Sequence, residues 1–145
     1  GSEMCIRDRE RGILFSISDN FASTTFFTYE SILLPAFINV INNAVYWLIP
    51  VEQRKIYIDI ISDGKILIQN SGVPIEDFYL KDIFKLFYTR KPTGRGIGLF
   101  LAQETLNSVG YNIFASNLPE HNKLNGACFI IDTKPSKEQN ENEYI

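Results

Sequence analysis

Cysteine and histidine are scarce in this sequence of 145 residues, which has two cysteines and one histidine. Two cysteines cannot build the disulfide framework of a small secreted domain, and with a single histidine they leave no zinc-finger spacing. Basic residues are too few for a general nucleic-acid binder, because 14 Lys and Arg are outnumbered by 17 Asp and Glu. These shortages favour a reducing, cytoplasmic setting and a partner other than DNA or RNA.

Apolar residues, in contrast, are plentiful. They make up 45% of the chain, and aromatic residues alone make up 13%. A chain of this length and composition can bury a core as one domain without disulfides or metal ions. The same numbers exclude a collagen, a coiled coil, a disulfide miniprotein and a disordered chain.

The first nine residues read GSEMCIRDR, a string that matches the in-frame translation of a transposase-based sequencing adapter. We therefore expect residues 1–9 to be foreign, and a gene that was cut upstream of this domain. A genuine start or a tag scar is the alternative. The domain itself is predicted over residues 10–135, and residues 136–145 are predicted to be a disordered polar tail.

Hydrophobic periodicity predicts an α/β two-layer sandwich, with a mixed or antiparallel sheet and helices on one face. Asp63-Gly64 is a strong hairpin signal, and Pro35 is expected in the first turn of the regular part of a helix. The predicted strands cover residues 13–18, 24–28, 55–62, 65–70, 111–115 and 127–133. The predicted helices cover residues 29–48, 81–88 and 99–109.

The longest apolar stretch, residues 31–51, is nearly long enough to span a bilayer. Three asparagines interrupt it, at positions 39, 42 and 43. Because amides in hydrocarbon need partners, the stretch is predicted to be a buried helix of a soluble domain.

Two of these asparagines, Asn39 and Asn43, are one turn apart on the predicted helix and share a face. Asparagine is a mediocre helix former, so an apolar helix has no structural need of two. Their side chains can ligate a hard cation such as Mg²⁺ or bond a phosphate. A hydrogen-bonded pair of core amides is the alternative.

A glycine-rich loop, KPTGRGIGL over residues 91–99, precedes the last predicted helix. Glycines at 94, 96 and 98 let the backbone approach a ligand, and the helix start adds unpaired amides. The spacing is neither that of a Walker loop nor that of a dinucleotide fingerprint. We interpret the loop as a polyphosphate site, with a plain surface loop as the alternative. The basic residues that gather before and within it are Lys81, Lys85, Arg90, Lys91 and Arg95.

Four motifs, in this order, resemble those of the GHKL superfamily of ATPases, which includes gyrase, histidine kinases and MutL. NVINNA (39–44) resembles its N-box, and NSGVPI (70–75) its first glycine box. IFKLFYTRK (83–91) is similar to the F-box of sensor histidine kinases, and GRGIGL (94–99) to the second glycine box. The resemblance covers almost the whole chain after residue 9. It implies the Bergerat fold, which holds ATP under a mobile lid.

The resemblance also implies a role for each matched residue. Asn39, Asn43 and Lys91 are implied to be catalytic, with Asn43 as the Mg²⁺ ligand. Asn70 corresponds to an aspartate that accepts a hydrogen bond from the adenine amino group.

The remaining implied residues surround the nucleotide. Gly72 would let the backbone approach the base, Ile75 would line the adenine pocket, and Trp47 would lie over the ring. The residues implied near the phosphates or within the matched boxes are Thr89, Lys91, Gly94, Arg95, Gly96, Gly98 and Leu99.

This sequence departs from the family pattern at three places. Asn70 replaces the aspartate, so the acceptor loses its charge. Pro74 replaces the second glycine of the first box, and the lid between Lys91 and Gly94 is short. These departures bear on nucleotide affinity and selectivity rather than on the fold.

Position 39 separates phosphoryl transfer from hydrolysis. Hydrolysing members of the superfamily have a glutamate there that activates water, whereas histidine kinases have asparagine. His121, the single histidine, lies in a predicted loop, so the phosphoacceptor is expected on an upstream domain.

We therefore expect the catalytic domain of a sensor histidine kinase, with ATP and Mg²⁺ as cofactors. Its expected partners are an upstream dimerisation and phosphoacceptor domain and, indirectly, a response regulator. The expected location is the cytoplasm, and the isolated domain is expected to be monomeric. Two alternatives stay open: an ATP-gated interaction or ATPase module, and a degenerate domain that binds no nucleotide.

Overall fold

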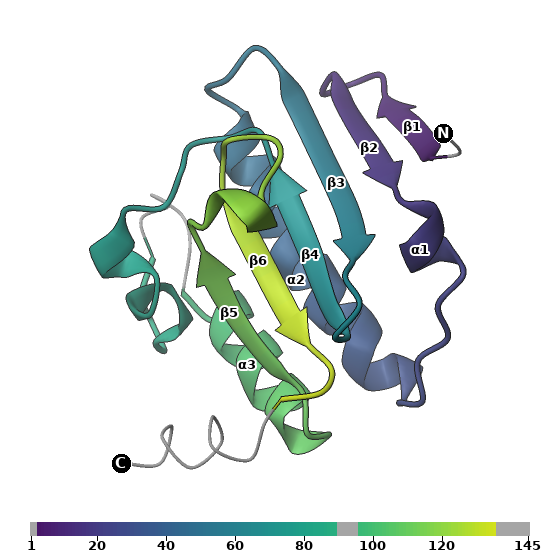
Figure 1. Ribbon diagram of the computed structural model, residues 1–145. Helices are drawn as coiled ribbons and strands as arrows, with labels where there is room; N and C mark the ends of the chain where they lie inside the picture. The colour runs from purple at the N-terminus through teal and green to yellow at the C-terminus, as the bar shows by residue number, and fades with distance from the viewer. Residues whose placement is uncertain (1–2, 90–95, 136–145) are drawn as a thin grey trace.

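A mixed sheet forms the centre of the structure, a computed structural model that describes residues 3–89 and 96–135. Within these residues the sheet has six strands in the order β1-β2-β3-β4-β6-β5. Strands β2 and β3 are parallel, and every other neighbouring pair is antiparallel. Helices α2 and α3 cover one face of the sheet (Figure 1). The predicted α/β sandwich with a mixed sheet is confirmed.

The bounds of the elements are close to those predicted for most of the chain. The strands are β1 (Met4–Asp8), β2 (Ile13–Ile17), β3 (Arg54–Ile60), β4 (Lys65–Asn70), β5 (Asn112–Ser116) and β6 (Cys128–Asp132). The α-helices are α1 (Asp19–Ala22), α2 (Glu30–Leu48) and α3 (Gly98–Ser108). One-turn 3-10 helices are η1 (Asp77–Tyr79), η2 (Asp82–Phe84) and η3 (Pro119–His121).

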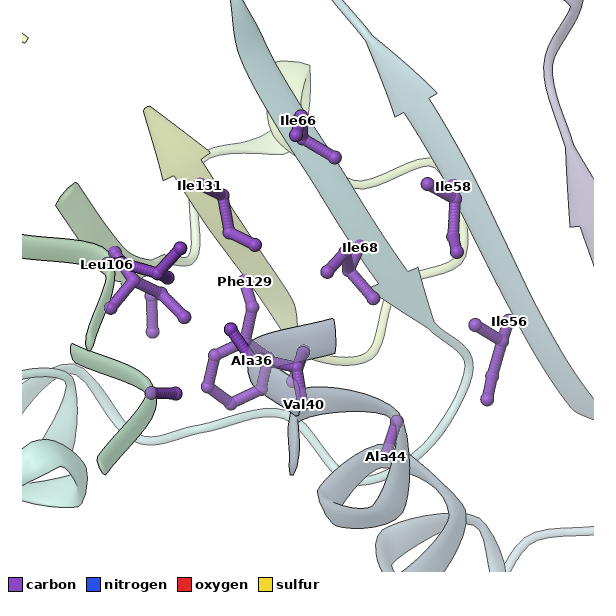
Figure 2. Close-up of a cluster of buried hydrophobic side chains, with 14 of the residues drawn as sticks. Ala36, Val40, Ala44, Ile56, Ile58, Ile66, Ile68, Leu106, Phe129 and Ile131 are labelled. Atoms are coloured by element: carbon purple, nitrogen blue, oxygen red, sulfur yellow. The ribbon is translucent and has the colours of Figure 1, made fainter. Parts of the chain in front are cut away.

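The main core lies between the sheet and the two long helices. Helix α2 is long and apolar enough to cross a membrane by length and composition alone, but here it packs on the sheet through one stripe at a spacing of four residues. That stripe consists of Ala36, Val40, Ala44 and Leu48, each at most 1% exposed. Figure 2 shows the strand side chains that point toward α2 and α3, namely Ile56, Ile58, Ile66, Ile68, Phe129 and Ile131.

Two predictions about the chain before and within α2 are wrong. Residues 24–28 form no strand; both edges of β2 are already paired, with β1 and β3. The alternating pattern there instead places Phe26 against Phe21, with ring centroids 6.1 Å apart, while Phe27 is 97% exposed. Pro35 lies inside α2 rather than in its first turn, because the helix begins at Glu30.

Residues 4–8, which lie within the segment predicted to be foreign, form strand β1, antiparallel to β2. Four of the five residues of β1 are exposed, so this edge strand adds little to the core. The foreign origin of residues 1–9 stays a prediction. The predicted polar tail over 136–145 lies outside the described residues.

Candidate functional site

A cavity of about 320 Å³ opens between α2, the first turn of α3 and the segment that follows β4. This volume falls in the range of small-ligand sites. No charged side chain lines the cavity among the described residues. The described lining residues are Asn39, Asn42, Asn43, Trp47, Asn70, Val73, Pro74, Ile75, Tyr79, Ile83, Tyr88, Thr89, Gly96, Ile97, Gly98, Leu99, Ala127 and Phe129.

Helix α2 supplies one wall of the cavity through a stripe next to its buried one. Asn39, Asn43 and Trp47 are spaced four residues apart, so they lie one above another on the helix. All three are half-buried and line the cavity. The predicted pairing of Asn39 and Asn43 on one helix face is therefore present, beside an aromatic ring that the resemblance places over the base.

The first turn of α3 supplies the opposite side. Gly96, Ile97, Gly98 and Leu99 all line the cavity, and no side chain of the described residues caps the helix start. The first backbone N–H groups of the helix therefore stay available to an anion, which the helix dipole also favours. A β-carbon at Gly98 would lie 3.2 Å from the Asn39 Oδ1 atom, so glycine lets α3 begin close to the asparagine pair.

The F-box segment packs directly on the second glycine box. Phe87 has a φ of +65° and Gly96 a φ of +69°, and the Phe87 N–H donates to the Gly96 carbonyl over 2.9 Å. A β-carbon at Gly96 would lie 2.4 Å from the Phe87 carbonyl carbon, so only glycine fits there. Of the basic residues singled out before this loop, Lys85 is paired with Asp82 at 2.7 Å.

Asn70 ends strand β4 at the inner wall of the cavity and is 1% exposed. Its Oδ1 atom accepts from the Gly72 N–H over 2.9 Å and from the Ala127 N–H over 3.3 Å. Its backbone is also paired, because the Asn70 N–H donates to the Ala127 carbonyl and the Gly126 N–H donates to the Asn70 carbonyl. The side chain thus ties the turn after β4 to the start of β6.

Gly126 and Ala127 are site residues that the sequence analysis missed. A β-carbon at Gly126 would lie 2.3 Å from the Asn70 carbonyl oxygen and 2.6 Å from the Gly72 nitrogen. Only glycine allows this approach, although in the sequence Gly126 is simply the last residue before a predicted strand. A glycine directly before an apolar strand was the one available signal. Gly72 is similar, since a β-carbon there would lie 2.8 Å from the Trp47 carbonyl oxygen.

A third missed residue, Asn117, holds the segment that contains Ile75. Its Nδ2 atom donates to the Ile75 carbonyl over 2.5 Å and to the Asp77 carboxylate over 2.8 Å. These bonds connect the loop after β5 to the cavity wall. His121, expected in an exposed loop, is half-buried in η3, with Nδ1 2.7 Å from the Ser116 hydroxyl.

This chain is similar to known proteins both in sequence and in structure. The sensor protein CitS of Halalkalibacterium halodurans is 31% identical over 118 residues, which cover 77% of this chain and 21% of CitS. The solved catalytic domain of histidine kinase ThkA matches with a TM-score of 0.65 at 26% identity, over 85% of this chain and 80% of that one. The domain is a catalytic ATP-binding domain of the sensor histidine kinase type.

Other solved histidine kinases share the fold of this kinase-type domain. The mycobacterial sensor histidine kinase MprB matches at a TM-score of 0.58 and 23% identity, over 72% of this chain and 70% of that one. The ATP-binding domain of PrrB from Mycobacterium tuberculosis matches at a TM-score of 0.57 and 19% identity, over 84% of this chain and 79% of that one. No protein-family model matches the chain. The chain spans about a fifth of CitS, so the activity of a whole kinase does not follow from this likeness.

The kinase-type domain brings most of the implied site residues together. Of those described, all but Gly72 line the cavity, and Gly72 is held behind it by Asn70. Lys91, Gly94 and Arg95 lie outside the described residues, so their implied roles stay predictions.

The described lining residues of this kinase-type domain also fit a magnesium ion. Asn43 offers a hard amide oxygen, and Mg²⁺ is commonly held by one or two protein oxygens together with substrate phosphates. The described residues contain no cluster of three His, Cys, Asp or Glu that could hold a metal by itself. Any Mg²⁺ at this site would therefore need the phosphates of a nucleotide as further ligands.

We predict that Gly126→Ala lowers the free energy of unfolding by about 1–3 kcal/mol, because its β-carbon meets backbone atoms that cannot move aside. Gly98→Ala is the matched control: its β-carbon meets only a side-chain oxygen at 3.2 Å, and alanine favours the helix. Urea titrations followed by circular dichroism measure both. Equal midpoints for wild type and Gly126→Ala would contradict the close approach.

Proposed function

We propose that this domain binds ATP together with Mg²⁺ and donates the γ-phosphoryl group to a histidine on a separate domain. The observation that supports this most is the convergence of three kinds of group on one cavity. These are the asparagine pair of α2, the buried Asn70 beside Gly72, and the uncapped first turn of α3. They suit a metal-phosphate group, a base and an anion, respectively.

In this proposal the first N–H groups of α3 bind the phosphates, and Asn43 orients them from α2. Trp47 and Ile75 enclose the base from two sides of the cavity, where both residues lie. Lys91, Gly94 and Arg95 are proposed to cover the phosphates. Bound Mg²⁺ supplies charge neutralisation on the phosphate oxygens during the transfer.

The transfer needs no base on this domain. A neutral imidazole nitrogen attacks the γ-phosphorus, the bond to the bridging oxygen breaks, and ADP leaves with that electron pair. Asn39 has no ionisable group, and no carboxylate lines the cavity among the described residues. A water molecule in the same place would need a proton acceptor, so transfer is favoured over hydrolysis.

The proposed partners are an upstream phosphoacceptor and dimerisation domain and, through it, a response regulator. A cytoplasmic location suits both the supply of ATP and Cys128, a buried cysteine that forms no disulfide. The relatives named above are sensor or histidine kinase proteins, which favours transfer over an ATP-gated module or a domain that binds no nucleotide.

Asn43→Ala is predicted to weaken binding of ATP in the presence of Mg²⁺ at least about tenfold, the size of a bond to a charged group. The effect should shrink when EDTA removes the metal. Asn107→Ala is the matched control, because Asn107 is an exposed asparagine of α3 that does not line the cavity. Isothermal titration calorimetry measures both, and an unchanged affinity in Asn43→Ala would exclude the metal role.

The isolated chain is predicted to hydrolyse ATP barely above background, because general-base assistance is worth about 10²–10⁴-fold and is missing here. Asn39→Glu should increase phosphate release. Asn39→Gln should not, because glutamine has the same side-chain length as glutamate but no charge. A wild-type turnover on the order of 1 s⁻¹, within the usual range of enzymes, would refute the assignment to transfer.

The transfer itself is tested with the proposed phosphoacceptor domain, supplied as a separate protein. Mixed with this chain and γ-labelled ATP, it is predicted to gain an acid-labile, alkali-stable phosphate on one histidine. Replacing that histidine by glutamine provides the control. Stable nucleotide binding without any labelled histidine would instead support the ATP-gated module.

A further inference from the structure

The amide of Asn70 is the one buried polar side chain that lines the cavity, among the described residues. Its two ends differ chemically: Oδ1 accepts hydrogen bonds, whereas Nδ2 donates two. Which end faces the cavity therefore determines what kind of atom a ligand must present there.

The backbone fixes the orientation of this amide. Two N–H groups, from Gly72 and Ala127, point at Oδ1 over 2.9 and 3.3 Å. A flipped amide would place its own N–H groups against both donors and leave all of them without an acceptor. The segments that carry these two N–H groups are joined by backbone hydrogen bonds, because the Asn70 N–H donates to the Ala127 carbonyl and the Gly126 N–H donates to the Asn70 carbonyl. Oδ1 is thus committed to the protein.

Nδ2 is then the atom that Asn70 offers to a ligand. It donates to none of the described residues, and it is not among the enclosed polar atoms that lack a partner. It therefore borders the open cavity. An aspartate in the same position would keep one oxygen on the backbone and turn a second acceptor into the cavity, whereas asparagine turns a donor there.

We propose that this site accepts nucleoside triphosphates with a 6-oxopurine base, inosine and guanosine triphosphate, at least as tightly as ATP. The proposal rests on the proposed function, because it assumes that the cavity holds a nucleotide with its base beside Asn70. Adenine has an amino group at C6, and this group is a hydrogen-bond donor like Nδ2, so the two cannot bond to each other. Hypoxanthine and guanine present a carbonyl oxygen at C6, which accepts from Nδ2.

Inosine triphosphate is the sharpest probe, because hypoxanthine differs from adenine only along the C6–N1 edge. Calorimetric titrations of wild type with ATP, ITP and GTP, each with Mg²⁺, should give ITP an affinity equal to or above that of ATP. In Asn70→Asp the ratio of ITP to ATP affinity should fall about tenfold or more, because a carboxylate attracts the amino group and repels the carbonyl. Asn42→Asp adds the same charge to the cavity at an exposed position, and there the ratio should stay unchanged.

A further measurement needs no variant and covers the case in which Asn70→Asp does not fold. Purine riboside triphosphate lacks the C6 substituent altogether, and it should bind wild type as tightly as ATP or more tightly. A clear preference of wild type for ATP over both ITP and purine riboside triphosphate would overturn this proposal and leave the proposed function standing. Absence of binding by all four nucleotides would overturn the proposed function itself.

Discussion

The seating of helix α2 on the sheet determines where the polar groups of the site lie. Ala36, Val40 and Ala44 are small and at most 1% exposed, so the helix lies close to the strands and cannot rotate without losing that contact. The neighbouring stripe, Asn39 and Asn43 with Trp47, is consequently turned toward the cavity. A nucleotide site can therefore be built from an otherwise apolar helix, because its core stripe and its site stripe occupy adjacent positions in the sequence.

The inner wall of the cavity, at the end of β4, depends on close backbone contact as well as on the Asn70 side chain. Gly126 lies against the backbone of Asn70 and Gly72, and the Asn70 oxygen joins these segments through two N–H groups. The asparagine therefore has a structural task as well as a position in the cavity. Using its oxygen for the first task leaves its nitrogen for the second, which is why an aspartate and an asparagine are not equivalent here.

Most of the fold follows from local patterns in the sequence. The hairpin at Asp63-Gly64 and the helix that contains Asn39 and Asn43 were predictable, because alternation, a turn dipeptide and an apolar period extend over whole elements. The strand predicted over residues 24–28 was wrong, because the alternation there reflects the packing of Phe26 on Phe21. Gly126 was missed because its need for glycine arises from Asn70, 56 positions earlier in the chain, and no local pattern contains that contact. The direction of the Asn70 amide was unpredictable for the same reason.

The central claim is that the cavity between α2 and α3 is where the nucleotide binds. Two-dimensional ¹H–¹⁵N NMR of the labelled chain during titration with ATP and Mg²⁺ tests it most directly. The account predicts saturable shifts of the Gly72, Gly98 and Ala127 amides, while the amide of Leu14, in β2 on the other side of the sheet, stays in place. Saturable shifts that gather around β1 and β2, with the three cavity amides unmoved, would contradict it.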